Sequence, residues 1–210
     1  MIRSFGIYLI LLFAILSSCN NQPKRLPFIQ LETTERVVNG KTIIDSTFRY
    51  IPAFKLLNQD STVVTEKSFD GTIYVADFFF TSCPTICPVM HRNLLKVYNK
   101  YKGNPEVKLV SHTIDVKYDL PSRMKSYATK LGIEGTQWEY LWGSRDEIYA
   151  LAERNYLVSA QEDKAAPGGF VHQGYLVLID KQKRIRGLYD GTVDGEVAQL
   201  MSDMDILLKE

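Results

Sequence analysis

The hydrophobic and polar positions of this chain follow two alternating periods. Short apolar and β-branched runs, bounded by turn residues, predict strands at 28–31, 37–38, 42–44, 51–57, 62–64, 73–80, 107–114, 138–142, 174–180 and 184–189. Apolar residues at helical spacing predict helices at 89–101, 121–131, 146–154 and 193–208. The run from Ile73 to Phe80 alternates too little for an exposed strand, so it predicts a central strand buried on both faces.

The order of these elements predicts the fold class. Strands and helices alternate from Ile73 to Arg154, which argues for a parallel-rich sheet covered on both faces. The chain then closes with a strand hairpin and a final helix, which is how thioredoxin-like domains end. We therefore predict an α/β, thioredoxin-like fold with a central mixed sheet flanked by helices. A β-rich N-terminal extension with an Asn39-Gly40 hairpin turn precedes it, and residues 159–169 are expected to form a polar loop.

The first residues predict export. Arg3 precedes an apolar run at 7–16, which is shorter than the ~20 residues of a spanning helix and fits a signal-peptide core. The run closes on a small-residue stretch before Cys19 that resembles a bacterial lipobox, whose cysteine is lipidated. A plain signal peptide, or an uncleaved anchor with an incidental cysteine, is the alternative. We predict a signal peptide at 1–18, a tether at 19–27 and one domain at 28–210, anchored by lipid to the cell membrane and facing the periplasm or the cell exterior.

The composition and net charge of the chain limit the classes of partner that it can bind. The 210 residues are 45% hydrophobic and carry a formal net charge of +1, as is ordinary for one globular domain. This balance provides no basic field, so we predict no nucleic-acid partner. The chain has three cysteines. With Cys19 assigned to the lipobox, Cys83 and Cys87 remain as the pair, in a compartment that normally oxidises thiols.

Cys83 and Cys87 are placed at the end of the predicted central strand and in the first turn of the next helix. The helix dipole and unpaired N–H groups there favour thiolate. C-x-x-x-C spacing permits a disulfide, or lets both sulfurs bind one soft metal ion. His172 lies in the loop that faces this helix in a thioredoxin-like fold, and two thiolates with one imidazole suit Cu(I), or Cu(II) with a further weak ligand. His91 and His112 are expected to be surface or packing residues.

Other uses of the two cysteines stay open. A thiol–disulfide oxidoreductase usually has an aromatic residue before the first cysteine, where this chain has Ser82, and a cis-proline before the facing strand, where it has 170–173. A peroxidase would need Thr or Ser at Phe80. A structural disulfide would close a loop so short that it adds little chain-entropy stabilisation. Zn²⁺ bound by two Cys, one His and water is chemically possible.

From Ile51 to Leu208 the chain resembles the SCO/SenC family, thioredoxin-like copper proteins tethered to membranes. The family pattern C-P-x-x-C-P after a phenylalanine-rich strand is met at 83–88, and its distal histidine is met by His172. The resemblance implies copper as the cofactor and Cys83, Cys87 and His172 as ligands. It also implies a partner, a cytochrome c oxidase subunit with a copper site, and a role in delivering copper or keeping that target's thiols reduced.

Two positions concern the fine structure of the site. The family's acidic stretch S-V-D-P-x-x-D corresponds to 113–119, with Val116 in place of proline, and implies a docking or tuning role for Asp115. A helix-capping or loop aspartate is the equal alternative. Val171 stands where the family usually has an acid, which removes a carboxylate next to His172. The leading hypothesis is a copper chaperone rather than an enzyme, and the alternative is an exported thiol–disulfide oxidoreductase.

Overall fold

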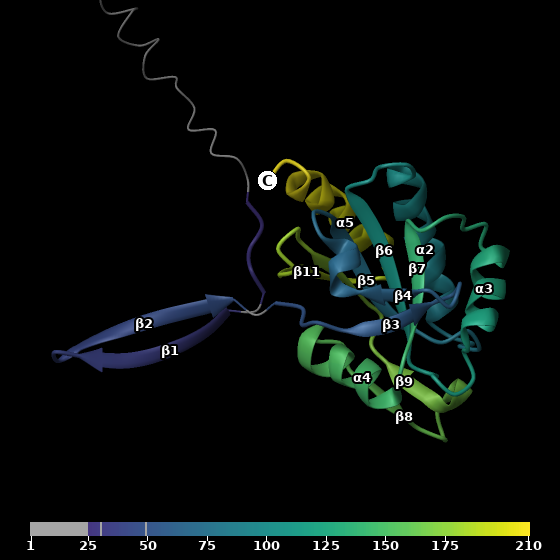
Figure 1. The fold of residues 1–210 in the computed structure, drawn as a ribbon, viewed down its shortest axis with the longest axis horizontal. Helices are drawn as coiled ribbons and strands as arrows, with labels where there is room; N and C mark the ends of the chain where they lie inside the picture. The colour runs from purple at the N-terminus through teal and green to yellow at the C-terminus, as the bar shows by residue number, and fades with distance from the viewer. Residues whose placement is uncertain (1–24, 30, 49) are drawn as a thin grey trace, which may run out of the picture.

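A seven-stranded mixed sheet forms the centre of the protein (Figure 1). The structure is a computed structural model that describes residues 25–29, 31–48 and 50–210, so the predicted signal peptide and Cys19 lie outside the described residues. The strand order is β11-β10-β5-β6-β7-β3-β4. The parallel strands are β5 (Ile73–Phe79), β6 (Val107–Thr113) and β7 (Trp138–Trp142). Antiparallel pairing adds β3 (Lys55–Asn58), β4 (Val63–Thr65), β10 (Tyr175–Ile179) and β11 (Ile185–Asp190). The predicted fold class is confirmed.

Helices cover both faces of this sheet. One face carries α2 (Cys87–Tyr101), α3 (Pro121–Lys130) and α5 (Asp194–Leu207). The other carries α4 (Arg145–Ala150), which a π-helical turn, Leu151–Asn155, continues. Successive side chains of a strand point to opposite faces: Phe79 contacts Tyr127 of α3, whereas Phe78 contacts Tyr156 beyond the π-helical turn. Every residue of β5 is buried, which confirms the predicted central strand.

The N-terminal extension is a hairpin that projects from the main body (Figure 1). Its strands, β1 (Leu31–Val38) and β2 (Lys41–Phe48), pair antiparallel around the predicted turn. Asn39 and Gly40 have φ of 52° and 73°, and positive φ at both positions suits the turn that matches strand twist. Leu26, predicted to be part of the tether, is instead buried against the domain. Within the described ranges, no helix is long and apolar enough to cross a membrane.

The segment before β10 differs from its prediction as a loop. It contains β8 (Ala160–Glu162), a 3-10 turn at Pro167–Gly169, and β9 (Phe170–His172), which pairs antiparallel with β8. A run of three residues is too short to show an alternating pattern in the sequence, so these strands were missed. A second 3-10 turn, Glu66–Phe69, precedes β5. Ser144 caps the start of α4, since its hydroxyl accepts a hydrogen bond from the Glu147 N–H.

Candidate metal centre

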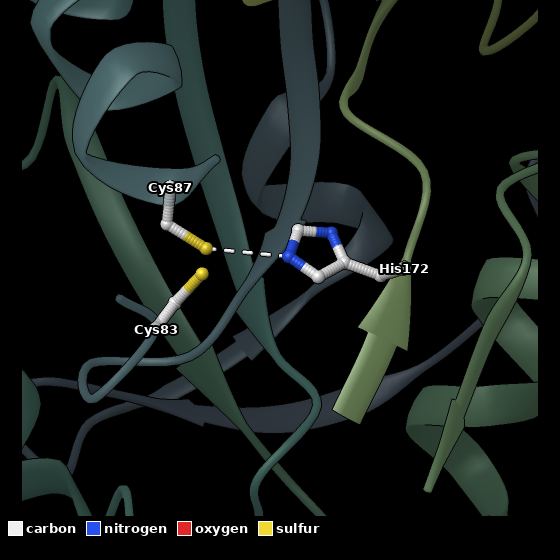
Figure 2. A group of neighbouring side chains, drawn as sticks. All are labelled: Cys83, Cys87 and His172. Carbon is white, nitrogen blue, oxygen red and sulfur yellow. Dashed lines mark hydrogen bonds between the residues drawn. The ribbon is translucent and has the colours of Figure 1, made fainter. Parts of the chain in front are cut away.

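Cys83, Cys87 and His172 come together beyond the carboxyl end of β5 (Figure 2). One ligand atom from each residue lies within 4.8 Å of the others, and Cys87 Sγ is 3.3 Å from His172 Nε2. Both cysteines are buried free thiols. In the part of the chain that the structure describes, this is the one group of three or more His, Cys, Asp or Glu side chains spaced to hold a metal ion. The fold therefore juxtaposes the three predicted residues, and their role as ligands stays a prediction.

Each of the three residues is placed by a different element. Cys83 lies in the turn after β5, where its N–H donates to the Phe80 carbonyl at 3.1 Å. Cys87 opens α2, and Pro88 at the start of that helix sacrifices no helical hydrogen bond. His172 ends β9, which the missed strand β8 supports. The position of the third side chain thus depends on a hairpin that the sequence pattern did not predict.

The tautomer of His172 leaves a lone pair facing the sulfurs. His172 Nδ1 lies 3.1 Å from the Gln173 carbonyl oxygen, which can only accept a hydrogen bond, so Nδ1 carries the proton. In a neutral ring Nε2 is then the unprotonated nitrogen, and it is the atom nearest Cys87 Sγ. A backbone carbonyl on the far nitrogen is a common arrangement for metal-binding histidines.

The two thiols have opposite acidities. A hydrogen bond from the Cys87 thiol is the main cause that lowers the pKa of Cys83 to about 3, and burial opposes this shift. Donation of that hydrogen bond, followed by burial, raises the pKa of Cys87 far above its usual range. At neutral pH the pair therefore holds one thiolate, on Cys83, and one proton, on Cys87. A metal ion that binds both sulfurs must displace that proton.

A buried carboxylate that sequence reasoning did not single out fixes the cysteine loop. Asp119 accepts hydrogen bonds from the Thr81 N–H at 2.7 Å, from the Thr81 hydroxyl, and from the Thr113 hydroxyl at 2.8 Å. Arg123 donates to Thr81 Oγ1 at 2.7 Å. Asp119 is fully buried, and a buried carboxylate requires such partners. The second carboxylate of the 113–119 stretch was its only signal in the sequence.

Asp115 is placed as a loop aspartate. Its carboxylate accepts a hydrogen bond from the Tyr118 N–H at 3.2 Å, and its own N–H donates to Thr113 Oγ1. Burial, and then the charge of Asp119, raises its pKa above the usual value. Asp115 does not belong to the group around the two sulfurs. This geometry favours the loop interpretation, and the docking or tuning role remains a prediction.

The other two histidines are packing residues, and the option of a surface position is wrong for both. His91 is fully buried and bonds Asp77 Oδ2 through Nε2 at 3.0 Å and the Tyr127 hydroxyl through Nδ1 at 2.9 Å. His112 is also fully buried, and neither of its ring nitrogens has a hydrogen-bond partner. Its ring stacks on the Phe78 ring, with the two ring centroids 4.8 Å apart.

Known proteins of similar sequence and fold can be compared with this geometry. The sequence model of the SCO1/SenC family matches residues 44–206. A SCO1/SenC family lipoprotein from Bacillus anthracis is 28% identical, with a TM-score of 0.69 over 76% of this chain and 95% of that chain. BsSco, a member of the Sco family of cytochrome c oxidase assembly proteins with a disulfide switch, is 26% identical, with a TM-score of 0.67 over 76% and 94%. Copper-bound ScoI from Arabidopsis thaliana shares the fold at 24% identity, with a TM-score of 0.63 over 75% and 99%.

Proposed function

Because the chain belongs to the SCO1/SenC family, we propose that it binds copper through Cys83, Cys87 and His172 and acts in assembly of the copper centre of cytochrome c oxidase. The observation that carries the copper proposal is the convergence of two sulfurs and one imidazole nitrogen within 4.8 Å. Soft thiolates select Cu(I), and imidazole accommodates either oxidation state. The oxidase partner comes from the family and from BsSco, which belongs to a family of oxidase assembly proteins.

In this proposal copper is cargo that the protein receives and passes on. Cys83 offers a thiolate, His172 Nε2 offers a lone pair, and Cys87 binds after losing its proton. The resulting proton release makes copper affinity increase with pH. Among the described His, Cys, Asp and Glu residues, no fourth side chain belongs to this group.

We also infer that Cys19 carries a lipid that holds the domain at the outer side of the cell membrane. The lipobox-like sequence before Cys19 supports this, and the similar Bacillus anthracis protein is a lipoprotein. Incorporation of labelled palmitate into the native chain, lost in Cys19→Ala, is the expected result. Equal labelling of both chains would contradict the lipid assignment.

Copper binding should be measured under reducing conditions for the wild type, Cys83→Ala and His172→Ala. We expect one bound copper in the wild type and an affinity at least about tenfold lower in each variant, a loss of ~1.4 kcal/mol or more. In separate samples loaded with Cu(II) without reductant, the thiolate-to-Cu(II) charge-transfer band should change in His172→Ala. His112→Phe is the control, because it removes a histidine outside the site and should retain wild-type copper binding. Unchanged affinity in both site variants would contradict the ligand assignment.

A second candidate function, thiol–disulfide exchange, uses the same sulfurs. The lowered pKa of Cys83, to about 3, makes that sulfur a thiolate at neutral pH. BsSco has a disulfide switch, which supports this candidate without excluding the first. Turnover of a disulfide substrate by copper-free protein, retained in His172→Ala, would favour exchange as the main activity. Loss of both turnover and copper binding in His172→Ala would favour the copper role.

A further inference from the structure

A groove with mostly apolar walls adjoins the candidate metal centre. It has a volume of about 170 Å³ and includes Cys83, Thr85 and His172. Its remaining walls are all apolar: Phe80, Ile86, Ala166, Pro167, Phe170 and Val171. Among the described residues that line it, His172 is the sole side chain besides the cysteine that can carry a formal charge. The groove is thus an apolar surface placed directly beside two of the three proposed ligands.

The walls of this groove are held in place by packing. The Phe80 and Phe170 rings contact each other with centroids 5.1 Å apart. Gly168 lies so close to Phe80 that a Cβ there would be 2.7 Å from the ring, so the turn before β9 is fitted against the cysteine loop. Val171, at the mouth, is 44% exposed. A preformed apolar recess with an exposed apolar rim can accept a side chain with little reorganisation.

The size of the groove selects its occupant. Pockets for small molecules usually measure ~300–1,000 Å³, which is larger than the 170 Å³ observed. An apolar protein cavity of about 150 Å³ is known to hold benzene. The groove therefore fits one aromatic or large aliphatic side chain rather than a whole metabolite.

The chemistry of copper transfer explains why a protein should cover this groove. Cys83 is only 8% exposed, so an acceptor must bring its own ligands to the mouth of the site to reach the ion. We propose that the groove docks a single aromatic or large aliphatic side chain of the copper acceptor, next to that acceptor's metal-binding thiols. This inference rests on the proposed copper function. During transfer, metal–ligand bonds to this chain break as bonds to the acceptor form. The acceptor thiols release protons, Cys87 takes up one proton while Cys83 stays a thiolate, and no electrons move.

The test begins without metal. Two labelled peptides carry two serines in place of acceptor thiols, four positions apart like Cys83 and Cys87. The peptides differ only in the residue directly before the first serine, which is Phe in one and Asp in the other. Their affinities for the full chain, reduced and free of metal, are measured by fluorescence anisotropy. We expect the Phe peptide to bind about tenfold more tightly. Matching peptides with cysteines then report the rate of copper transfer from loaded protein, and the Phe peptide should again be favoured.

Two groove variants and one matched control assign the preference to this surface. Val171→Asp and Ala166→Asp each place a charge in the lining, and Ala166 occupies a helix-capping position, where Asp is well tolerated. Both variants should lose the preference for Phe. Val63→Asp is the matched control, because Val63 is 50% exposed and lies on β4, another three-residue strand. This variant should keep the preference for the Phe peptide. Unfolding midpoints verify that all three variants fold.

Each outcome decides the inference. Equal affinity for the two peptides in the wild type, or a preference that survives in both groove variants, would overturn it. Self-association of the wild type that Val171→Asp abolishes would assign the groove to a second copy of the chain and also overturn it. Copper stoichiometry is measured separately on the same proteins. Absence of copper binding would contradict the proposed function while the metal-free peptide preference could still be read.

Discussion

The three histidines differ in what their ring nitrogens contact, and this difference separates their roles. His172 has one nitrogen on a backbone carbonyl and the other facing Cys87 Sγ. His91 has a partner on each nitrogen, so its polar groups are satisfied inside the core. His112 has none, and burial lowers its pKa to about 4. A neutral imidazole among aromatic rings behaves as a packing group, and protonating it costs free energy.

His112 predicts a pH dependence of stability. Its pKa falls from 6.5 to about 4 on folding, so the unfolded chain binds the extra proton between these values. The stabilisation is present above pH 6.5 and decreases as the pH falls towards 4. The loss from this residue should reach roughly 2–4 kcal/mol. Urea unfolding of the wild type and His112→Phe between pH 7.5 and 4 checks this, because effects of other groups cancel in the comparison.

In His112→Phe the free energy of unfolding should decline less over this pH range than in the wild type. Removing a different histidine provides the control. The His172 ring is not fully buried. In His172→Ala the free energy of unfolding should therefore decline with falling pH as in the wild type, because His112 is still present. Parallel pH profiles for the wild type and His112→Phe would refute the assignment.

The β8–β9 hairpin and the cysteine loop form one unit of the site. β9 carries His172, and the 3-10 turn before it packs against Phe80 and Pro84 through Gly168. The cysteine loop is also held by Asp119, which accepts a hydrogen bond from the Thr81 N–H. Neither segment is a long regular element. Precise placement of the three candidate ligands therefore depends on close contacts between short segments, as preorganised sites require.

Two adjacent glycines test the fit of this hairpin. Gly168 and Gly169 have φ of 81° and 87°, so alanine at either position adopts a left-handed backbone at a cost of about 1–2 kcal/mol. A Cβ at Gly168 would also lie 2.7 Å from the Phe80 ring, whereas one at Gly169 meets nothing within 4 Å. Gly168→Ala should therefore lose a further ~1–3 kcal/mol and bind copper more weakly. Urea unfolding and copper titration of both variants measure this. Equal losses would show that Gly168 does not fix the hairpin.

The segment through which the N-terminal part of the chain joins the domain, and the candidate metal centre, lie at opposite ends of the central sheet. Asp180 follows Ile179, which pairs with Tyr74 near the start of β5, while Cys83 follows the end of β5. At the first end, buried Arg186 donates to the Leu26 and Pro27 carbonyls and pairs with the carboxylates of Asp180 and Glu210. This network joins the N-terminal segment, β11 and the C-terminus. With the proposed lipid at Cys19, the site would point away from the anchored end.

Arg186→Ala should destabilise the entire domain. The side chain is 1% exposed. Its removal leaves Asp180 with Arg184 as its ion-pair partner but takes the arginine from Glu210 and from the Leu26 and Pro27 carbonyls, at a cost of about 1–3 kcal/mol for each buried acceptor left unpaired. Arg36→Ala is the control, since its ion pair with Asp45 joins side chains that are 63% and 44% exposed and should contribute at most ~1 kcal/mol. Urea unfolding of both variants gives the comparison. A similar small loss in each would show that the Arg186 network is not a structural clamp.

The sequence by itself determined the features that are encoded by local patterns. The apolar run of β5, the helical spacing after Cys87 and the Asn39-Gly40 turn each predict backbone structure from neighbouring residues. The order of these elements then predicts the mixed sheet, and cysteine spacing with a distal histidine predicts the candidate site. In these cases the physical signal is either the spacing of buried residues or the preference of residues for a turn conformation, and it lies within a few neighbouring residues. The three-residue strands β8 and β9 are too short to produce such a signal.

Only the tertiary structure decided which groups contact one another. Thr81 and Asp119 are 38 positions apart, and Cys87 and His172 are 85 apart. The packed fold also places the Gln173 carbonyl that sets the His172 tautomer, brings the two thiols into the mutual hydrogen bond that gives them opposite acidities, and buries Asp119. Burial of His91 and His112, and docking of Leu26, follow from the same packing. Residue types show which chemistry is available, and the packed fold determines distance, solvation and proton position, on which that chemistry depends.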